Sequence, residues 1–236
     1  MLKRILKIIA GILLGILLLI ICGYNLLVLY QIKGIPKISP TNGGEHSLQI
    51  KEIVWTCNFG NKPILNMRKY PFWKWVYINF TQPHESNKPS DFRAANFVGK
   101  ELLRRFSSGA PTRNLGYGMK MAFTAVWISE NWSADQTMEF ILDSNFWGHG
   151  FYGINKASQG YFGVESKDLS KEEAVVLAKM MKAPSQYDPW CEPEKTKRMS
   201  IEWMKRSEKD GVTGLKKDST KIWARLRPYE RSLCQE

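Results

Sequence analysis

Histidine, acidic residues and repeated sequence are all scarce in this chain of 236 residues. The three histidines, His46, His84 and His149, are scattered, and no cysteine or histidine has the spacing of a metal-ligand motif. No internal repeat is present, which excludes a solenoid. With 22 acidic against 34 basic residues the formal net charge is +12, so the expected partner is anionic: lipid headgroups, a phosphorylated substrate or nucleic acid.

Charge is absent from residues 8–30, and this apolar run is long enough to span a bilayer as a helix. Lys3, Arg4 and Lys7 precede it, which predicts a cytoplasmic N-terminus and an extracytoplasmic body. A cleaved signal peptide is the alternative, but the run exceeds the usual roughly 7–15 apolar residues and no Ala-x-Ala site follows. We therefore predict a retained single-pass anchor with a membrane as partner, which argues against nucleic acid.

The remaining length allows one folded domain of ordinary size. We predict a cytoplasmic N-terminus at residues 1–7, a transmembrane helix at 8–30, a linker at 31–50, the folded domain at 51–208 and a charged tail at 209–236. Three cysteines fall outside the anchor, where a disulfide can form. They cannot all pair with one another, and the sequence leaves the pairing of Cys57, Cys191 and Cys234 open.

Helix signals dominate the predicted domain. Asp91 is placed to cap a helix reaching Phe106, and residues 119–129 form an apolar helical stretch. The sequences from Ser133 and from Ser170 have the form of capping boxes, opening helices at 134–142 and 171–181. A further helix is predicted at 193–205, so the fold class is mainly α.

Glycines and aromatic residues alternate in residues 146–163, directly after a helical segment that carries Glu139. This stretch reads Phe-Trp-Gly-His-Gly-Phe-Tyr-Gly-Ile, then Ala-Ser-Gln-Gly-Tyr-Phe-Gly. Together with Thr-Met-Glu-Phe-Ile-Leu-Asp at 137–143 and Ala-Pro-Ser at 183–185, it resembles the peptidoglycan glycosyltransferases of family 51, in the monofunctional branch without a transpeptidase domain. The resemblance covers about 70 residues, within 136–193.

The resemblance implies a lysozyme-like helical domain that polymerises the lipid-linked disaccharide-peptide precursor into glycan strands, at the outer face of the bacterial cytoplasmic membrane. Such chemistry needs a carboxylate base and cations that stabilise the departing diphosphate. It implies Glu139 as the acidic site residue, and Lys120, Lys100 and Arg104 facing the diphosphate. A divalent metal, Mg or Mn, is compatible with the family, and other cell-wall synthesis proteins are expected partners.

The early part of the chain departs from the family pattern. The family motif Glu-Asp-x-x-Phe-x-x-His is absent, and Asn58-Phe59 stands where its two acidic residues are expected. An asparagine cannot act as a base. Residues 95–102 and 117–121 also lack the next two family motifs, and only Lys120 offers a charge in the second of them.

Several alternatives therefore stay open. The chain is either an active enzyme, with Glu85 or Glu52 as substitute base, or a catalytically inactive relative that binds precursor, glycan or another cell-wall enzyme. A glycan-cleaving enzyme is disfavoured by the family match. Each candidate residue also has an interpretation without a functional role. In that interpretation Glu139 is a solvated helix residue, His149 is a packing residue, and the basic residues form a solvated face. The aromatic cluster either dips into the bilayer surface or forms core; it comprises Phe72, Trp73, Trp75, Tyr77 and Phe80.

Overall fold

The computed structural model describes residues 2–31, 46–60, 67–106, 115–215, 220–228 and 234, and these are mostly helical, which confirms the mainly-α prediction. Within them, the one β pairing is an isolated antiparallel bridge between Phe146 and Tyr152. The helices, in chain order, are α1 Leu2–Gln31, α2 Leu48–Phe59, α3 Phe72–Thr81, the 3-10 turn Glu85–Asn87, α4 Ser90–Phe106, α5 Leu115–Asn131, α6 Ala134–Ser144, α7 Ile154–Phe162, the 3-10 turn Ser166–Asp168, α8 Lys171–Met180, α9 Pro193–Lys209 and α10 Thr220–Arg225.

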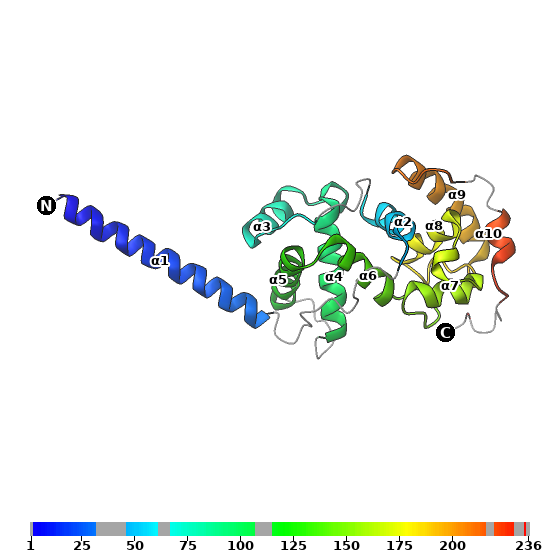
Figure 1. The fold of residues 1–236 in the computed structure, drawn as a ribbon, viewed down its shortest axis with the longest axis horizontal. Coiled ribbons are helices and arrows are strands. Elements are labelled where there is room, and N and C mark those ends of the chain that lie inside the picture. The colour runs from blue at the N-terminus through cyan, green and yellow to red at the C-terminus, as the bar shows by residue number, and fades with distance from the viewer. Residues whose placement is uncertain are drawn as a thin grey trace.

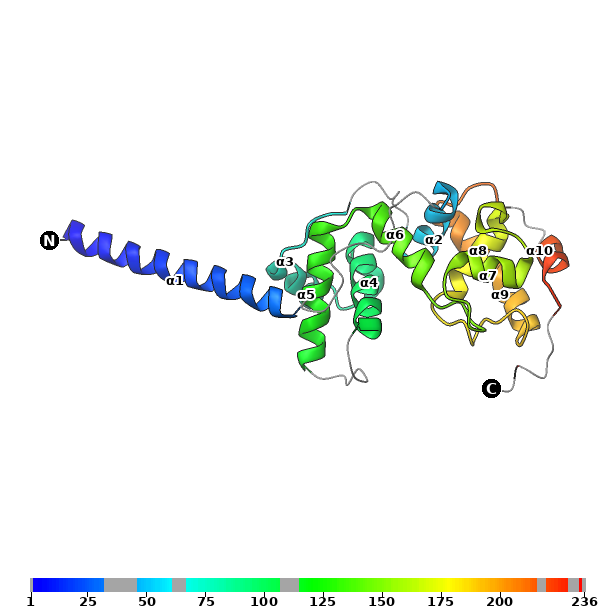
Figure 2. The same cartoon turned by 60° about the horizontal axis from the view of Figure 1, so that its bottom comes forward.

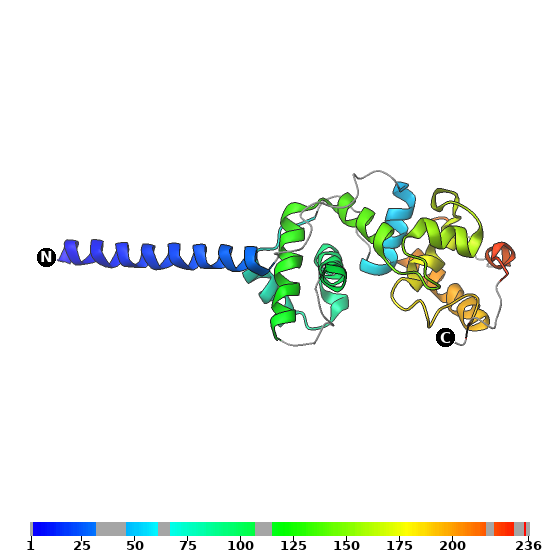
Figure 3. The same cartoon turned by 90° about the horizontal axis from the view of Figure 1, so that it is seen from below.

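Helix α1 projects from the body as a straight rod (Figure 1). Its residues Lys3–Leu26 are long and apolar enough to cross a membrane, and no other helix among the described ranges passes that test. The ring of Tyr24 contacts the rings of Phe72 on α3 and Phe123 on α5, each at 6.0 Å between centroids. Helices α3 and α5 therefore lie at the α1 end of the body, whereas α9 and α10 lie at the opposite end (Figures 2 and 3).

Two packed helix pairs form the centre of the body, and α2 and α6 connect them. Helix α4 packs along α5, and α2 packs along α8. Helices α2 and α6 also contact α4 and each other, which joins the two pairs into one hydrophobic core. Trp147 and Tyr161, both from the glycine and aromatic stretch, are fully buried in that core.

Both predicted capping boxes are present. The Ser133 hydroxyl accepts from the Gln136 amide at 3.1 Å, and the Gln136 side chain accepts from the Ser133 amide at 2.9 Å. Ser170 and Glu173 make the same reciprocal pair at the start of α8. These bonds satisfy amides that have no partner inside the helix, so local sequence fixes both helix starts.

Both ends of the predicted domain pack more extensively than the sequence suggests. His46, assigned to the linker at 31–50, is buried, and Ser47 accepts from the Ile50 amide as the cap of α2. The rest of that linker, residues 32–45, lies outside the described residues. In the predicted tail, α10 buries Ile222, and Cys234 forms a disulfide with Cys191.

Candidate functional site

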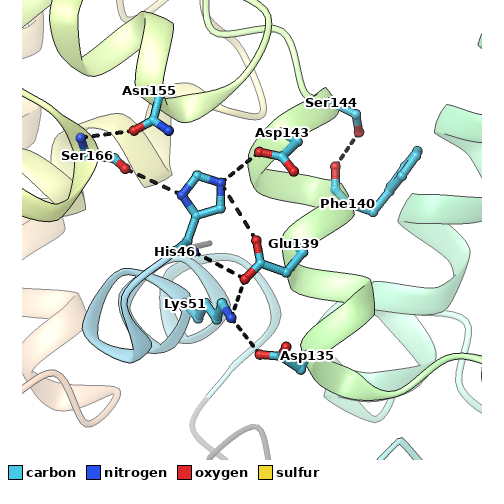
Figure 4. A network of polar contacts seen from close by, with 9 residues as sticks. All are labelled: His46, Lys51, Asp135, Glu139, Phe140, Asp143, Ser144, Asn155 and Ser166. Carbon is cyan, nitrogen blue, oxygen red and sulfur yellow. Dashed lines mark hydrogen bonds and ion pairs between the residues drawn. The ribbon is translucent and has the colours of Figure 1, made fainter. Parts of the chain in front are cut away.

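Three acidic residues form a stripe along α6 that faces the beginning of α2. Asp135, Glu139 and Asp143 are spaced four apart, so they share one helix face. Figure 4 shows His46 and Lys51 pointing at this stripe from the α2 side. The side chain of Glu139 is 0% exposed, whereas that of Asp143 is 30% exposed. The predicted site residue Glu139 therefore lies inside a polar network, not on a solvated helix face.

Lys51 is the cationic member of this network. Its ammonium donates to Asp135 Oδ1 at 2.6 Å and forms an ion pair with Glu139 Oε1. Burial alone lowers the pKa of Lys51, but the hydrogen bonds to Asp135 and Glu139 outweigh it and hold the pKa above the ordinary lysine value. Lys51 is therefore charged at neutral pH, and it compensates the buried carboxylate.

His46 connects the acidic stripe to the segment after α7. Its backbone amide donates to Glu139 Oε1 at 3.3 Å, and its ring Nε2 lies 2.7 Å from Asp143 Oδ1. The other ring nitrogen, Nδ1, lies 3.4 Å from the Ser166 hydroxyl. The Ser166 amide in turn donates to Asn155 at 3.1 Å (Figure 4). Both ring nitrogens of His46 therefore have polar partners.

A cavity of about 320 Å³ lies at the opposite end of α2. Asn58 is seven residues beyond Lys51, a rise of about 10 Å along the helix, so the cavity and the acidic network are separate places. The wall of the cavity is apolar at Phe59, Trp75, Phe97 and Met121 and polar elsewhere. The remaining lining residues are Asn58, Asn79, Glu85, Arg93, Asn96, Lys100 and Lys182.

Three cations gather at the C-terminus of α2, beside this cavity. Arg93 donates to the carbonyls of Phe59 at 2.9 Å and Asn58 at 2.8 Å. Lys182 donates to Asn58 at 3.0 Å, and Lys179 donates to Cys57 at 2.6 Å. These carbonyls have no partner inside the helix and carry the negative end of its dipole, which attracts cations.

The cations also repel one another. Desolvation of the Lys182 ammonium, followed by the charges of Arg93 and Lys179, lowers its pKa to about 8. An anion entering the cavity would relieve this repulsion. The arrangement therefore suits an anionic ligand with an apolar part.

The side chain of Asn58, the residue expected in place of a family acid, is bound to backbone carbonyls. Its side-chain amide donates to the Val54 carbonyl at 3.0 Å and to the Ala178 carbonyl at 2.9 Å. It thereby joins α2 to α8. Glu85 is the acidic residue among those that line the cavity, and Lys88 holds its carboxylate at 2.8 Å.

The glycine and aromatic stretch closes over the end of α6. The Gly153 amide donates to Asn145 at 3.0 Å, and a Cβ at Gly153 would lie 2.9 Å from the Asp143 carbonyl. With φ of 89° the position also favours glycine. His149, at φ 47°, pairs with Asp188 and packs on Trp190. The stretch therefore shapes the scaffold around Asp143, and His149 is one of its packing residues.

The predicted basic site residues are dispersed. Lys100 lines the cavity. Arg104 is exposed and forms an ion pair with Glu101 at 2.6 Å. Lys120 lies partly exposed on α5, next to the cavity residue Met121. None of these three is among the partners of Glu139 in the network of Figure 4.

Four residues of the acidic network and of the cavity were not predicted from the sequence: His46, Lys51, Arg93 and Lys182. The spacing of Asp135, Glu139 and Asp143 was a readable signal for a basic partner. Nothing local in the sequence identifies that partner, because His46 is 93 residues away from Glu139. Arg93 on α4 and Lys182, two residues beyond α8, meet only because α4 and α8 both pack on α2.

Known proteins match the central part of the chain. Residues 100–207 match the family model described as Transglycosylase. Penicillin-binding protein 2D of Bacillus subtilis is 36% identical over 96 residues, 41% of this chain and 14% of the relative. Penicillin-binding protein 1A of Aquifex aeolicus is 34% identical over 99 residues, 42% of this chain and 14% of the relative.

Penicillin-binding protein 1A of Escherichia coli is 32% identical over 97 residues, 41% of this chain and 11% of the relative. The chain thus spans only a small part of the length of these curated relatives. The matched residues contain α5 to α8, Glu139 and the glycine and aromatic stretch. Residues 100–207 are therefore similar to a transglycosylase domain, family 51 of the glycosyltransferases, as the resemblance in the sequence implies.

Proposed function

We propose that this protein is a membrane-anchored, glycosyltransferase-like protein that binds the lipid-linked disaccharide-peptide precursor of peptidoglycan without polymerising it. The observation that carries this proposal is the cavity at the end of α2, which combines Arg93, Lys100 and Lys182 with aromatic walls. The expected replacement of a family acid by Asn58 points the same way. Basic groups suit a diphosphate, and apolar walls suit the first part of a lipid.

The environment of Glu139 supports the same proposal. A general base must reach the proton that it removes. The Glu139 carboxylate is 0% exposed and is held by Lys51 and the His46 amide. We infer that Glu139 acts within the fold, by joining α6 to α2.

Glycan polymerisation is the second candidate function, because Glu85 lines the same cavity. A carboxylate there can take the proton of an acceptor hydroxyl while the basic residues hold the diphosphate. In this alternative Glu85 is the base, and Lys88, which also donates to Asn79, orients it. The family partners, glycan strands and other cell-wall proteins, belong to either candidate.

The decisive experiment incubates the purified full chain with lipid-linked precursor and measures both binding and polymer. We expect saturable binding and no polymer, with affinity lowered about 10-fold or more in Arg93→Met or Lys182→Met, since hydrogen bonds between charged groups contribute about 1.5–3 kcal/mol. Arg198→Met on α9 is the matched control, because it removes a basic residue away from the cavity.

Polymer formation would overturn the binding-only proposal. Loss of that polymer in Glu85→Gln would then assign the base to Glu85, and loss in Glu139→Gln alone would assign it to Glu139. A chain that neither binds precursor nor forms polymer would contradict both candidates.

A further inference from the structure

Helix α9 buries one face and exposes a line of positive charge on the other. The buried side chains, which pack toward the core, are Thr196, Ser200, Trp203, Met204 and Ser207. Arg198, Lys205 and Lys209 are exposed and are spaced seven and four residues apart. At 3.6 residues per turn they therefore follow one line, about 16 Å long, on the side of the helix opposite the buried face. These three residues are called the α9 cation line below.

The α9 cation line has no counter-charge of its own among the described residues. The ion pairs of α9 in that part of the chain join its other cations, Lys197 and Arg206, to glutamates of the same helix. Lys205 and Lys209 are four apart, a spacing at which like charges on a helix repel each other. The helix dipole favours basic residues in the last turn, which does not account for Arg198 in the first half of α9. An anion bound from outside would compensate the line.

An exposed apolar residue lies among these charges. Ile201, at 45% exposure, borders an open hollow of about 590 Å³ together with the cation line and Arg206. An apolar centre with a polar rim is the usual composition of a protein–protein interface. A phosphate polymer would pair with the cations and leave Ile201 uncovered, whereas an acidic protein segment can cover both. The hollow therefore favours a polypeptide as the anionic partner.

The position of α9 argues against a lipid partner. Helix α9 lies at the end of the body opposite α1 (Figures 2 and 3). A membrane that α1 crosses is therefore far from the cation line. The residues that line the cavity at the end of α2 come from other segments of the chain. The outer face of α9 is thus a separate surface, and its role does not depend on binding of the precursor.

We propose that the outer face of α9 binds an acidic segment of another protein. Carboxylates of the partner pair with Arg198, Lys205 and Lys209, and an apolar side chain of the partner packs on Ile201. A partner helix with acidic residues at the same spacing of seven and four meets all three cations along one face. The charges set the orientation and the rate of association, and the contact with Ile201 adds apolar burial.

The test is a fluorescence anisotropy titration of a labelled synthetic helical peptide with the detergent-purified full chain. The peptide carries glutamates at a spacing of seven and four around a leucine, and a scrambled peptide of the same composition is its control. We expect saturable one-to-one binding, at least about 10-fold tighter than that of the scrambled peptide, because only the ordered peptide presents its charges along one face.

Two variants separate the charged from the apolar contribution. Arg198→Gln combined with Lys205→Gln should weaken peptide binding about 5-fold, since exposed ion pairs contribute modestly, and this effect should shrink at high salt. Ile201→Ser should weaken binding about 10-fold at low and at high salt, because salt does not screen apolar burial. Lys156→Gln combined with Lys197→Gln is the matched control, because it removes the same charge away from the line and should leave the affinity unchanged.

Circular dichroism checks that each variant is folded, which we expect because the substituted side chains do not belong to the core. Absence of saturable binding, equal binding of the scrambled peptide, or an equal loss in the control variant overturns the proposal. So does displacement of the peptide by inorganic polyphosphate together with an unchanged affinity in Ile201→Ser, because the partner is then a phosphate polymer. Self-association of the chain that is lost in Ile201→Ser, measured by sedimentation, would assign the face to a second copy and overturn it as well.

Discussion

Lys51 and Glu139 depend on each other because both side chains are almost fully buried. Removing one member of a buried ion pair leaves the other charge uncompensated, and this costs more than the pair contributes. The raised pKa of Lys51 has a defined sign: its stabilisation is complete at neutral pH and is lost only as pH rises above the ordinary lysine range.

We therefore expect Lys51→Met to lower the free energy of unfolding by about 3–5 kcal/mol. Urea unfolding followed by circular dichroism measures the change. Lys197→Met is the matched control, since Lys197 pairs with Glu194 on the surface of α9 and should cost under about 1 kcal/mol. Combining Lys51→Met with Glu139→Met should restore most of the lost stability. Equal losses in Lys51→Met and the control would contradict a buried pair.

Lys182 sets the pH dependence expected for anion binding in the cavity. Because its pKa is about 8 in the free protein, raising the pH from 7 to 9 removes its proton from most molecules. Affinity for a soluble diphosphate should then fall by up to about 10-fold. Lys182→Arg keeps its charge over this range and should flatten the profile. A wild-type affinity independent of pH would exclude Lys182 from the binding site.

At the scale of elements, the helix starts that carry a capping box were predictable, whereas other starts and the packing partners of the helices were not. Ser133 and Ser170 predict the starts of α6 and α8, because a capping box involves only four consecutive residues. The apolar run at 53–57 gave no sign that α2 begins at Leu48 or that Lys51 points inward. That orientation comes from Asp135 and Glu139, which lie 84 and 88 residues later.

In the candidate site, too, local sequence predicted some residues, whereas the residues that come from distant segments were missed. Glu139 was identified from a family resemblance in its own helix, whereas His46 was assigned to a linker because the residues before it are rich in Pro and Gly. Lys100 lines the cavity, and its role toward a diphosphate stays a prediction, whereas the cations that cap α2, Arg93 and Lys182, come from α4 and from the turn after α8. Burial and cross-helix contacts decide these roles, and one sequence does not contain them.

Helix α3 divides its aromatic residues between two faces. Phe72 stacks on Phe123 at 4.7 Å, and the ring of Trp75 lies close to Phe92, while Trp73, Tyr77 and Phe80 are 69%, 62% and 82% exposed. The second group is spaced four and three apart, so it forms one outer face. Helix α3 lies at the α1 end of the body, where exposed Trp and Tyr suit a membrane surface.

We expect Trp73 to be quenched by brominated lipids when the full chain is reconstituted in nanodiscs. Trp73→Phe should therefore remove a large share of the quenching. Trp203→Phe, which removes a tryptophan that is 6% exposed on α9 at the far end of the body, should leave the quenching unchanged. Equal quenching in wild type and Trp73→Phe would remove α3 from the membrane surface.

For the molecule as a whole, the disulfide links the C-terminal segment to the body and carries information about the compartment. Cys191 and Cys234 are 43 residues apart in sequence. Closing a loop of that length stabilises a fold by about 4 kcal/mol in the chain-entropy model. Between them, α10 buries Ile222, and the Arg227 amide donates to Tyr161 at 2.8 Å.

Disulfides persist in oxidising compartments, so the bond agrees with a body outside the cytoplasm, as proposed from the basic residues before α1. Alkylation of the denatured protein, isolated with its thiols trapped, should add two labels without reductant, at Cys22 and Cys57, and four labels after reduction. Cys234→Ser should lower the melting temperature by several degrees, because about 4 kcal/mol of loop entropy is lost, whereas Cys22→Ser should not. Four labels without reductant would place the body in a reducing compartment and contradict both the bond and the orientation.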